Sequence, residues 1–121
     1  MIRIIGTRLI VPKGDTGCFT LPNRFLPEKG NVAVFSVKDP LTQTTVIEKY
    51  LDASDSHLLI QIENEDTCGL SAGKYFWDIV FYHKPKYDED GFLIDAMEIN
   101  SYYSAYTQPL LIIKEVAKNY V

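Results

Sequence analysis

Hydrophobic and polar positions alternate most strictly from Gly73 to His83, in the run GKYFWDIVFYH. β-branched and aromatic residues dominate this run and no proline interrupts it, so we predict the central strand of a sheet. With the two-residue period of a strand, the more apolar face consists of Tyr75, Trp77, Ile79 and Phe81. The opposite face consists of Lys74, Phe76, Asp78, Val80 and Tyr82. Burial of the apolar face would stabilise the fold by roughly 1.5 to 3 kcal/mol per side chain.

Shorter segments with the same alternation predict further strands, each bounded by turns rich in glycine, proline or aspartate. Gly6 lies inside the first segment and is expected to let the alternation change phase through a β-bulge. Glu48 and Lys49 lie in the middle of another segment, which is therefore predicted at a sheet edge. The predicted strands cover residues 2–11, 17–21, 31–38, 44–51, 57–63, 92–103 and 108–116.

Two of these strands carry an apolar side chain at alternate positions. We predict that these side chains point inward, toward the same core as the apolar face of the central strand. They are Ala33, Phe35 and Val37 in one strand and Leu58, Ile60 and Ile62 in the other.

Two segments break the strand pattern. The segment NEDTCGL, from Asn64 to Leu70, predicts one helical turn, with Asn64 as the capping residue that accepts a bond from the amide of Asp66 or Thr67. The segment KPKYDEDG, which ends at Gly91, predicts a charged hairpin tip with an Asp-Gly turn. About eight short strands at this spacing predict an all-β fold, an immunoglobulin-like antiparallel β-sandwich of about 7–9 strands with one short helical turn near residues 64–70.

Length and charge narrow the function classes. The chain has 121 residues, of which 46% are hydrophobic, so we predict one domain over residues 1–121. A formal net charge of -4 disfavours a surface that follows nucleic-acid phosphates. The apolar start carries Arg3 and Arg8 and lacks a small-residue cleavage site, so it predicts a strand rather than a signal peptide or membrane span. We expect a soluble, unprocessed protein made in the cytosol, with no membrane partner.

Cysteine chemistry adds little. Cys18 and Cys68 are the only cysteines, and neither belongs to a CxxC or Cys/His cluster. This excludes the common zinc motifs and a disulfide framework. We expect two buried free thiols, with a single disulfide as the alternative.

No residue pattern typical of catalysis is present. His57 near Asp55, and His83, lack a nucleophile in a strand-turn elbow, so both histidines are expected on the surface or at strand ends. Asp88 to Gly91, with Asp95 downstream, offers the oxygen atoms and glycine turn of a calcium site but not the full ligand spacing. We therefore favour a solvated hairpin tip over a metal site, and predict no catalytic residue, no cofactor and no enzyme activity.

A series of short motifs follows one order along the chain. The residues that carry it are Gly14-Asp15-Thr16, Phe35-Ser36-Val37-Lys38, Ile60-Gln61-Ile62-Glu63-Asn64-Glu65-Asp66-Thr67 with Leu70, and Ala72-Gly73-Lys74-Tyr75-Phe76-Trp77-Asp78-Ile79. In this order they resemble a small β-sandwich module of bacteriophage virion proteins, best known as the N-terminal domain of baseplate upper proteins. Most of the chain is covered, and the motifs are those of a fold: a glycine turn, a capped helical turn and a glycine that enters a strand.

The chain departs from this module in two respects. The hairpin from His83 to Ser104 is longer, and we expect no receptor-binding or fibre domain after Val121. The resemblance implies a structural component of a phage particle, such as a baseplate, tail, connector or capsid-decoration subunit, assembled in the host cytoplasm. It further implies docking on other virion proteins and on copies of the chain itself.

The second face of the central strand is too apolar to be left in water, so another part of the chain or a neighbouring subunit must cover it. Tyrosine is enriched in protein interfaces, and tyrosines cluster in the C-terminal half. The candidate interface residues are Phe76, Val80, Tyr82, Tyr102, Tyr103 and Tyr106. An alternative function is a carbohydrate-binding β-sandwich module, in which exposed tyrosines such as Tyr102 and Tyr103 stack on sugars. A third, an enzyme accessory or inhibitor domain, has no positive feature in the sequence.

Overall fold

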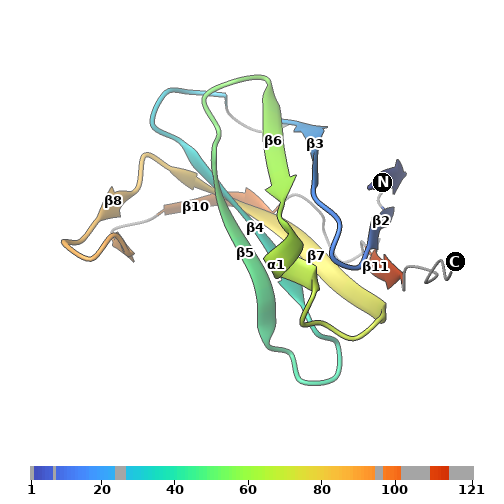
Figure 1. Cartoon of the computed structure of the whole chain (residues 1–121). Helices are drawn as coiled ribbons and strands as arrows, with labels where there is room; N and C mark the ends of the chain where they lie inside the picture. Colours follow the sequence, from blue (N-terminus) through green and yellow to red (C-terminus); the bar gives the residue numbers. More distant parts are fainter. Residues whose placement is uncertain (1, 7, 24–26, 95–96, 102–109, 115–121) are drawn as a thin grey trace, which may run out of the picture.

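A computed structural model describes residues 2–6, 8–23, 27–94, 97–101 and 110–114 of the chain (Figure 1). The described residues form short strands and one helical turn. These elements are β1 (Arg3–Ile5), β2 (Arg8–Pro12), β3 (Gly17–Pro22), β4 (Val32–Lys38), β5 (Thr45–Asp52), β6 (His57–Ile62), α1 (Asn64–Thr67), β7 (Gly73–His83), β8 (Lys86–Tyr87), β9 (Leu93–Ile94), β10 (Met97–Ser101) and β11 (Leu110–Lys114).

Strand β7 lies at the centre of the larger sheet, as the alternation from Gly73 to His83 predicts. The strand order is β1-β2-β11-β7-β4-β5, and β10 also pairs with β7. Strand β4 pairs with β7 along its whole length, from Val32 opposite Tyr82 to Lys38 opposite Phe76. Neighbouring strands in this sheet are antiparallel, except that β11 runs parallel to β2. At the other end of the order, β5 is an edge strand, as its central charges predict.

Strands β3 and β6 form a second, two-stranded sheet that packs on one face of the larger sheet (Figure 1). Phe19 of β3 meets Phe35 of β4 edge to face, with ring centroids 6.1 Å apart. Phe35 in turn lies 5.7 Å from Trp77, which is 2% exposed. The predicted inward faces of β4, β6 and β7 are all buried between these two layers. The core is completed by Leu9, Val11, Leu21, Ile47, Leu51, Ala53 and Ile113.

Two predicted strands are wrong in their extent. The segment 2–11 is not one bulged strand but two strands that fold back on each other, with Arg3 opposite Ile10 and Ile5 opposite Arg8. Gly6 has a φ of +63°, a conformation that reverses the chain at little cost for glycine. The segment 92–103 is divided between β9, which pairs with β8, and β10, which pairs with β7. Alternation alone cannot reveal this change of partner, because both pieces have the same period.

The helical turn is confirmed at Asn64–Thr67, but its cap lies one residue earlier than predicted. The backbone N–H of Glu63 donates to the carboxylate of Asp66 across 2.7 Å. The same carboxylate forms an ion pair with the ammonium group of Lys49 on β5, at 2.8 Å. Asn64 does not cap the helix, because its side-chain amide donates instead to the carbonyl of Gly14.

Within the described residues the chain is thus a mostly β structure of antiparallel strands in small sheets, with one short helical turn and no closed barrel. The immunoglobulin-like arrangement remains a prediction. Cys18 and Cys68 are free, but both are exposed rather than buried, because Cys18 points outward from β3 and Cys68 lies at the surface directly after α1. No helix in this described part has the length and apolar run needed to cross a membrane.

Candidate functional site

The face of the larger sheet that points away from the core is the candidate docking surface, and we call it the outer face. Strand register defines its cross-strand rows. From one end of β7 to the other, these rows are Tyr82 with Val32 and Asp52, Val80 with Val34 and Tyr50, Asp78 with Ser36 and Glu48, and Phe76 with Lys38.

Three predicted interface residues, Phe76, Val80 and Tyr82, lie on this outer face and are each partly exposed. Val34, directly opposite Val80, is buried on the same face. The structure therefore brings the three residues together on one surface, and their role as an interface remains a prediction. The other three predicted interface residues, Tyr102, Tyr103 and Tyr106, lie outside the described residues.

Beside Tyr82 the outer face is hollowed. An open hollow of about 300 Å³ is lined by Tyr50 and Tyr87, which are 50% and 46% exposed, together with Asn31, Val32 and Asp52. We call it the tyrosine hollow. Desolvation of the phenol and the nearby Glu48 carboxylate raise the pKa of Tyr50.

Asp52 supplies a carboxylate to the same hollow. The hydroxyl and backbone N–H of Ser54 both donate to Asp52, and these bonds lower the pKa of its carboxyl group. Sequence reasoning missed Tyr50 and Asp52 as site residues. Their spacing could have indicated the site, because two residues that are two positions apart in a strand point to the same face of the sheet.

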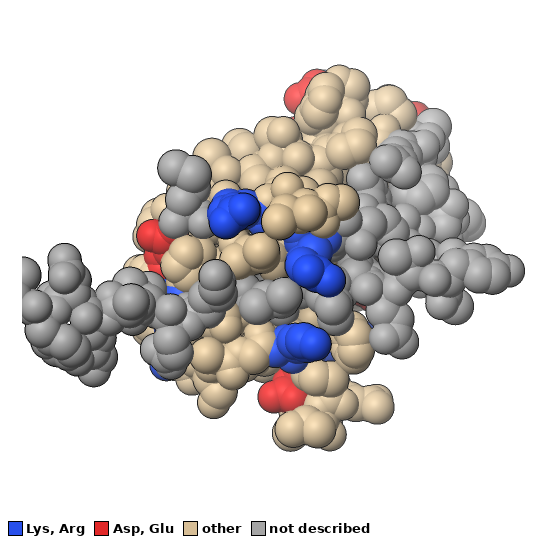
Figure 2. Space-filling view, turned by 90° about the vertical axis from the view of Figure 1, so that its right-hand side faces the viewer, with Lys and Arg blue, Asp and Glu red and all other residues tan. Residues whose placement is uncertain are grey.

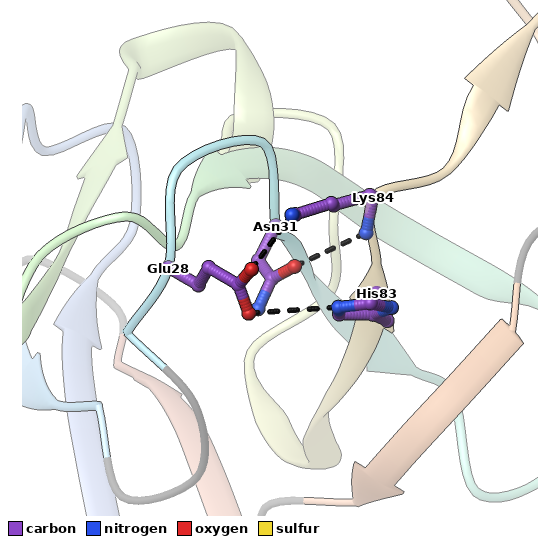
Figure 3. Close-up of polar contacts among 4 residues, drawn as sticks. All are labelled: Glu28, Asn31, His83 and Lys84. Carbon is purple, nitrogen blue, oxygen red and sulfur yellow. Dashed lines mark hydrogen bonds and ion pairs between the residues drawn. The ribbon is translucent and has the colours of Figure 1, made fainter.

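A polar cluster holds the loop that lines this hollow (Figure 3). The carboxylate of Glu28 lies 2.7 Å from the ammonium nitrogen of Lys84 and 3.5 Å from Nε2 of His83. The backbone N–H of Lys84 donates to the side-chain oxygen of Asn31, which is 2% exposed. The bond from Lys84 holds the pKa of the Glu28 carboxyl below its usual 4.5. This cluster ties the end of β7 to the loop before β4.

Both histidines lie at strand ends, as predicted: His57 begins β6 and His83 ends β7. The Nδ1 atom of His57 lies 3.1 Å from the hydroxyl of Ser56. His83 faces the Glu28 carboxylate. The two histidines thus have separate local partners.

Strands β8 and β9 form a hairpin, and we call residues Lys86–Ile94 the acidic arm. One carboxylate oxygen of Asp88 accepts the backbone N–H groups of Asp90 and Phe92, each across 2.9 Å. This carboxylate therefore holds the turn predicted at Asp90-Gly91. Among the described residues, no three His, Cys, Asp or Glu side chains are grouped so as to hold a metal ion.

The motifs that carry the family resemblance meet in space. The glycine turn at Gly14 and the helical turn at Asn64–Thr67 are joined by two hydrogen bonds. Gly73 enters β7 with a φ of +151°, a conformation that favours glycine. These contacts give the glycine turn, the helical turn and Gly73 local structural roles. Comparisons with models of protein families, with curated proteins and with solved structures found no match to this chain.

Proposed function

We propose that this protein is a structural component of a bacteriophage particle that acts by docking on other proteins and performs no catalysis. Its place would be the baseplate, tail, connector or capsid decoration. The observation that carries the docking role is that Phe76, Val80 and Tyr82 are partly exposed on the outer face of β7. Val80 and Tyr82 are neighbours, whereas the polar row of Asp78 separates them from Phe76; exposed apolar side chains with a polar surround are typical of protein interaction sites. The phage context rests on the order of the motifs.

We further propose that the two layers are an immunoglobulin-like β-sandwich. Support comes from the edge-to-face contact of Phe19 with Phe35, which joins the β3–β6 pair to the larger sheet. Strand order favours the same idea only in part, because β11 runs parallel to β2. Before assembly the protein would be present in the host cytoplasm.

The test is incorporation into particles. A phage that lacks its own copy would be complemented with the wild-type chain or with Phe76→Ser or Tyr82→Ser, and purified particles would be analysed by mass spectrometry. Leu59→Ser is the control, because Leu59 is exposed on β6, away from the outer face. We expect the wild type and the control in stoichiometric amounts and at least about tenfold less of the two variants. Absence of the wild-type protein from particles would contradict the proposal.

A specific observation favours a second candidate, a carbohydrate-binding module. Tyr50 and Tyr87 flank the tyrosine hollow with a carboxylate from Asp52, which matches the aromatic faces and polar groups of many small-ligand sites. A glycan array with the wild type, Tyr50→Ala and Phe92→Ala tests it. Binding that is lost in Tyr50→Ala and kept in Phe92→Ala would support this function, and no binding by the wild type would exclude it.

A further inference from the structure

The outer face carries a cluster of cations at the end opposite the tyrosine hollow. Arg3, Arg8, Lys38 and Lys74 are all exposed, and we call them, together with Phe76 between them, the basic face. In the part of the chain that the structure describes, none of these four cations forms an ion pair. Figure 2 shows Lys and Arg side chains gathered near the middle of the surface at the β2 and β11 end of the molecule.

Strand register places the four cations on one face of the larger sheet, with Arg8 opposite Ile5. Arg3 pairs with Ile10, and the row continues through residue 112 of β11 to Lys74. Because neighbouring strands lie about 4.8 Å apart, the Cα atoms of Arg3 and Lys74 are about 15 Å apart. Lys38 pairs with Phe76 in the adjacent row. The carboxylates nearest to Phe76 are those of Asp39, which follows Lys38, and Asp78, the next outward residue of β7, so the excess of positive charge lies on the β1, β2 and Lys74 side of the phenyl ring.

The acidic arm has the complementary chemistry. Its turn carries three exposed carboxylates, those of Asp88, Glu89 and Asp90, followed by Phe92 with 66% of its surface exposed. Its strands are only two residues long each. A hairpin this short buries little of its own apolar surface, so contact with another surface would stabilise it.

We propose that copies of this chain associate head to tail, with the acidic arm of one copy on the basic face of the next. Glu89 and Asp90 would pair with the cations of the basic face. Phe92 would occupy the hollow of about 190 Å³ that Lys38, Asp39, Pro40, Gln43 and Phe76 line, and its uncharged ring can approach the Asp39 carboxylate where Glu89 and Asp90 could not. This inference rests on the proposed docking function and names the two surfaces that perform it.

The occupant is a second copy because one chain cannot make the contact itself. Lys74 and His83 lie nine positions apart on β7, a separation of about 30 Å along the strand. Figure 1 accordingly shows β8 at one end of the molecule and β2 and β11 at the other. Because the two surfaces differ, the contact is heterologous and leads to a ring if the rotation closes or to a filament if it does not.

Sedimentation velocity on the full chain, over a range of protein concentrations, tests this. The arm variant carries Glu89→Gln, Asp90→Asn and Phe92→Ser, and the face variant carries Arg8→Gln and Lys74→Gln. Glu65→Gln and Lys29→Gln are the controls, because both residues are exposed and belong to neither surface. Trp77 fluorescence, which reports on the buried core, verifies that each variant is folded.

We expect the wild type and both controls to associate at low salt, and each variant to show a dissociation constant raised at least about tenfold. An equimolar mixture of the arm and face variants is expected to form pairs that grow no further, because the mixture retains one intact surface of each kind. Wild-type association is expected to weaken steeply at about 0.5 M salt, because exposed charges are screened. This last measurement needs no variant.

Three results would overturn head-to-tail association: a wild type that is monomeric at every concentration, association that does not depend on salt, or variants that associate like the wild type. If the wild type is monomeric and the face variant is nevertheless missing from particles, the basic face would bind an acidic segment of another virion protein instead. In that case the docking function stands, since incorporation into particles is measured separately.

Discussion

The backbone N–H of Gly14 donates to the hydroxyl of Thr67, which lies 53 residues further along the chain, across 2.8 Å. The side chain of Asn64 returns a bond to the carbonyl of Gly14 at 2.6 Å. Thr67 is completely buried. Since Gly17 pairs with Ile62, the turn before β3 and the helix after β6 lie at the same end of this strand pair. The two hydrogen bonds therefore hold the Gly14 turn and α1 together at that end of the β3–β6 sheet.

Replacement of Thr67 by valine removes this contact with little change in shape. The N–H of Gly14 then loses its acceptor in a partly buried site, and we expect the free energy of unfolding to fall by about 1 to 3 kcal/mol. Urea denaturation followed by Trp77 fluorescence measures the change. Thr67→Ser keeps the hydroxyl, so its free energy of unfolding is expected to fall by less than that of Thr67→Val. Equal decreases in the two variants would show that the hydrogen bond is not the main contribution of Thr67.

A side chain at Gly14 should be destabilising for two reasons. The residue has a φ of +80°, and an added Cβ would lie 3.2 Å from the side-chain nitrogen of Asn64. We expect Gly14→Ala to lower the free energy of unfolding by about 1 to 3 kcal/mol. Gly69→Ala is the matched control, because Gly69 lacks a positive φ and a Cβ there meets nothing within 4 Å. Similar denaturation midpoints for the two variants would contradict the expectation.

Phe35 connects the two layers, because its ring contacts both Phe19 and Trp77. It is completely buried, so Phe35→Ala should leave a cavity and lower the free energy of unfolding by about 3 to 5 kcal/mol. Phe92→Ala removes an exposed ring and should change it by less than about 0.5 kcal/mol. Chemical denaturation of both variants checks this, and a small effect at Phe35 would mean that the layers are held together elsewhere.

The contact between Glu28 and Lys84 predicts a dependence of stability on pH. The folded-state pKa of Glu28 is lowered from 4.5 because Lys84 donates to the carboxylate, so the contact stabilises the fold fully above pH 4.5. That contribution is lost as the pH falls through the lower, folded-state value. We expect the stability difference between the wild type and Glu28→Gln to be constant above pH 4.5, to decline below it and to vanish only below the lowered folded-state pKa.

Thermal or urea unfolding across the acidic range measures this difference. Glu65→Gln is the control, because it removes an exposed carboxylate without removing a partner of Lys84. A difference between the wild type and Glu28→Gln that stays unchanged down to the lowest pH would show that the ion pair contributes nothing to stability.

Asp88 is expected to order the tip of the acidic arm. Because its carboxylate accepts the N–H groups of Asp90 and Phe92, Asp88→Ala should speed hydrogen exchange at these two amides several-fold, roughly as the loss of one or two hydrogen bonds predicts. Asp88→Asn keeps an acceptor oxygen and should retain most of the protection. Amide exchange by NMR measures both variants, and unchanged exchange in Asp88→Ala would show that the turn forms without the carboxylate.

Much of the fold follows from local pattern. The alternation in β7 correctly predicts its full extent from Gly73 to His83 and its place between other strands. The charges of β5 correctly predict an edge, since β5 ends the strand order and Lys49 pairs with Asp66 outside the larger sheet. The predicted bulge at Gly6 is wrong because a positive φ is equally compatible with a reversal of the chain. Only the pairing of β1 with β2 distinguishes these outcomes.

The candidate site was less accessible from sequence. Phe76, Val80 and Tyr82 were correctly placed on one face, because a shared face is a consequence of spacing alone. The sequence does not predict that Tyr50 and Tyr87 line one hollow, because Tyr50 belongs to β5 and Tyr87 to the acidic arm, and only the tertiary structure brings these two elements together. The basic face likewise joins Arg3 to Lys74 across the β1–β2 pair, β11 and β7, which come from three distant parts of the chain.

Spacing along the chain therefore decides which side chains of each strand are buried, because the two-residue period is a property of the backbone itself. The order of strands decides which residues become neighbours, and this depends on contacts between distant segments that leave no local periodicity. Gly14 with Thr67, and Glu28 with Lys84, are such neighbours. For this protein, periodicity predicted the core, whereas the tyrosine hollow, the polar cluster and the basic face were decided by the tertiary structure.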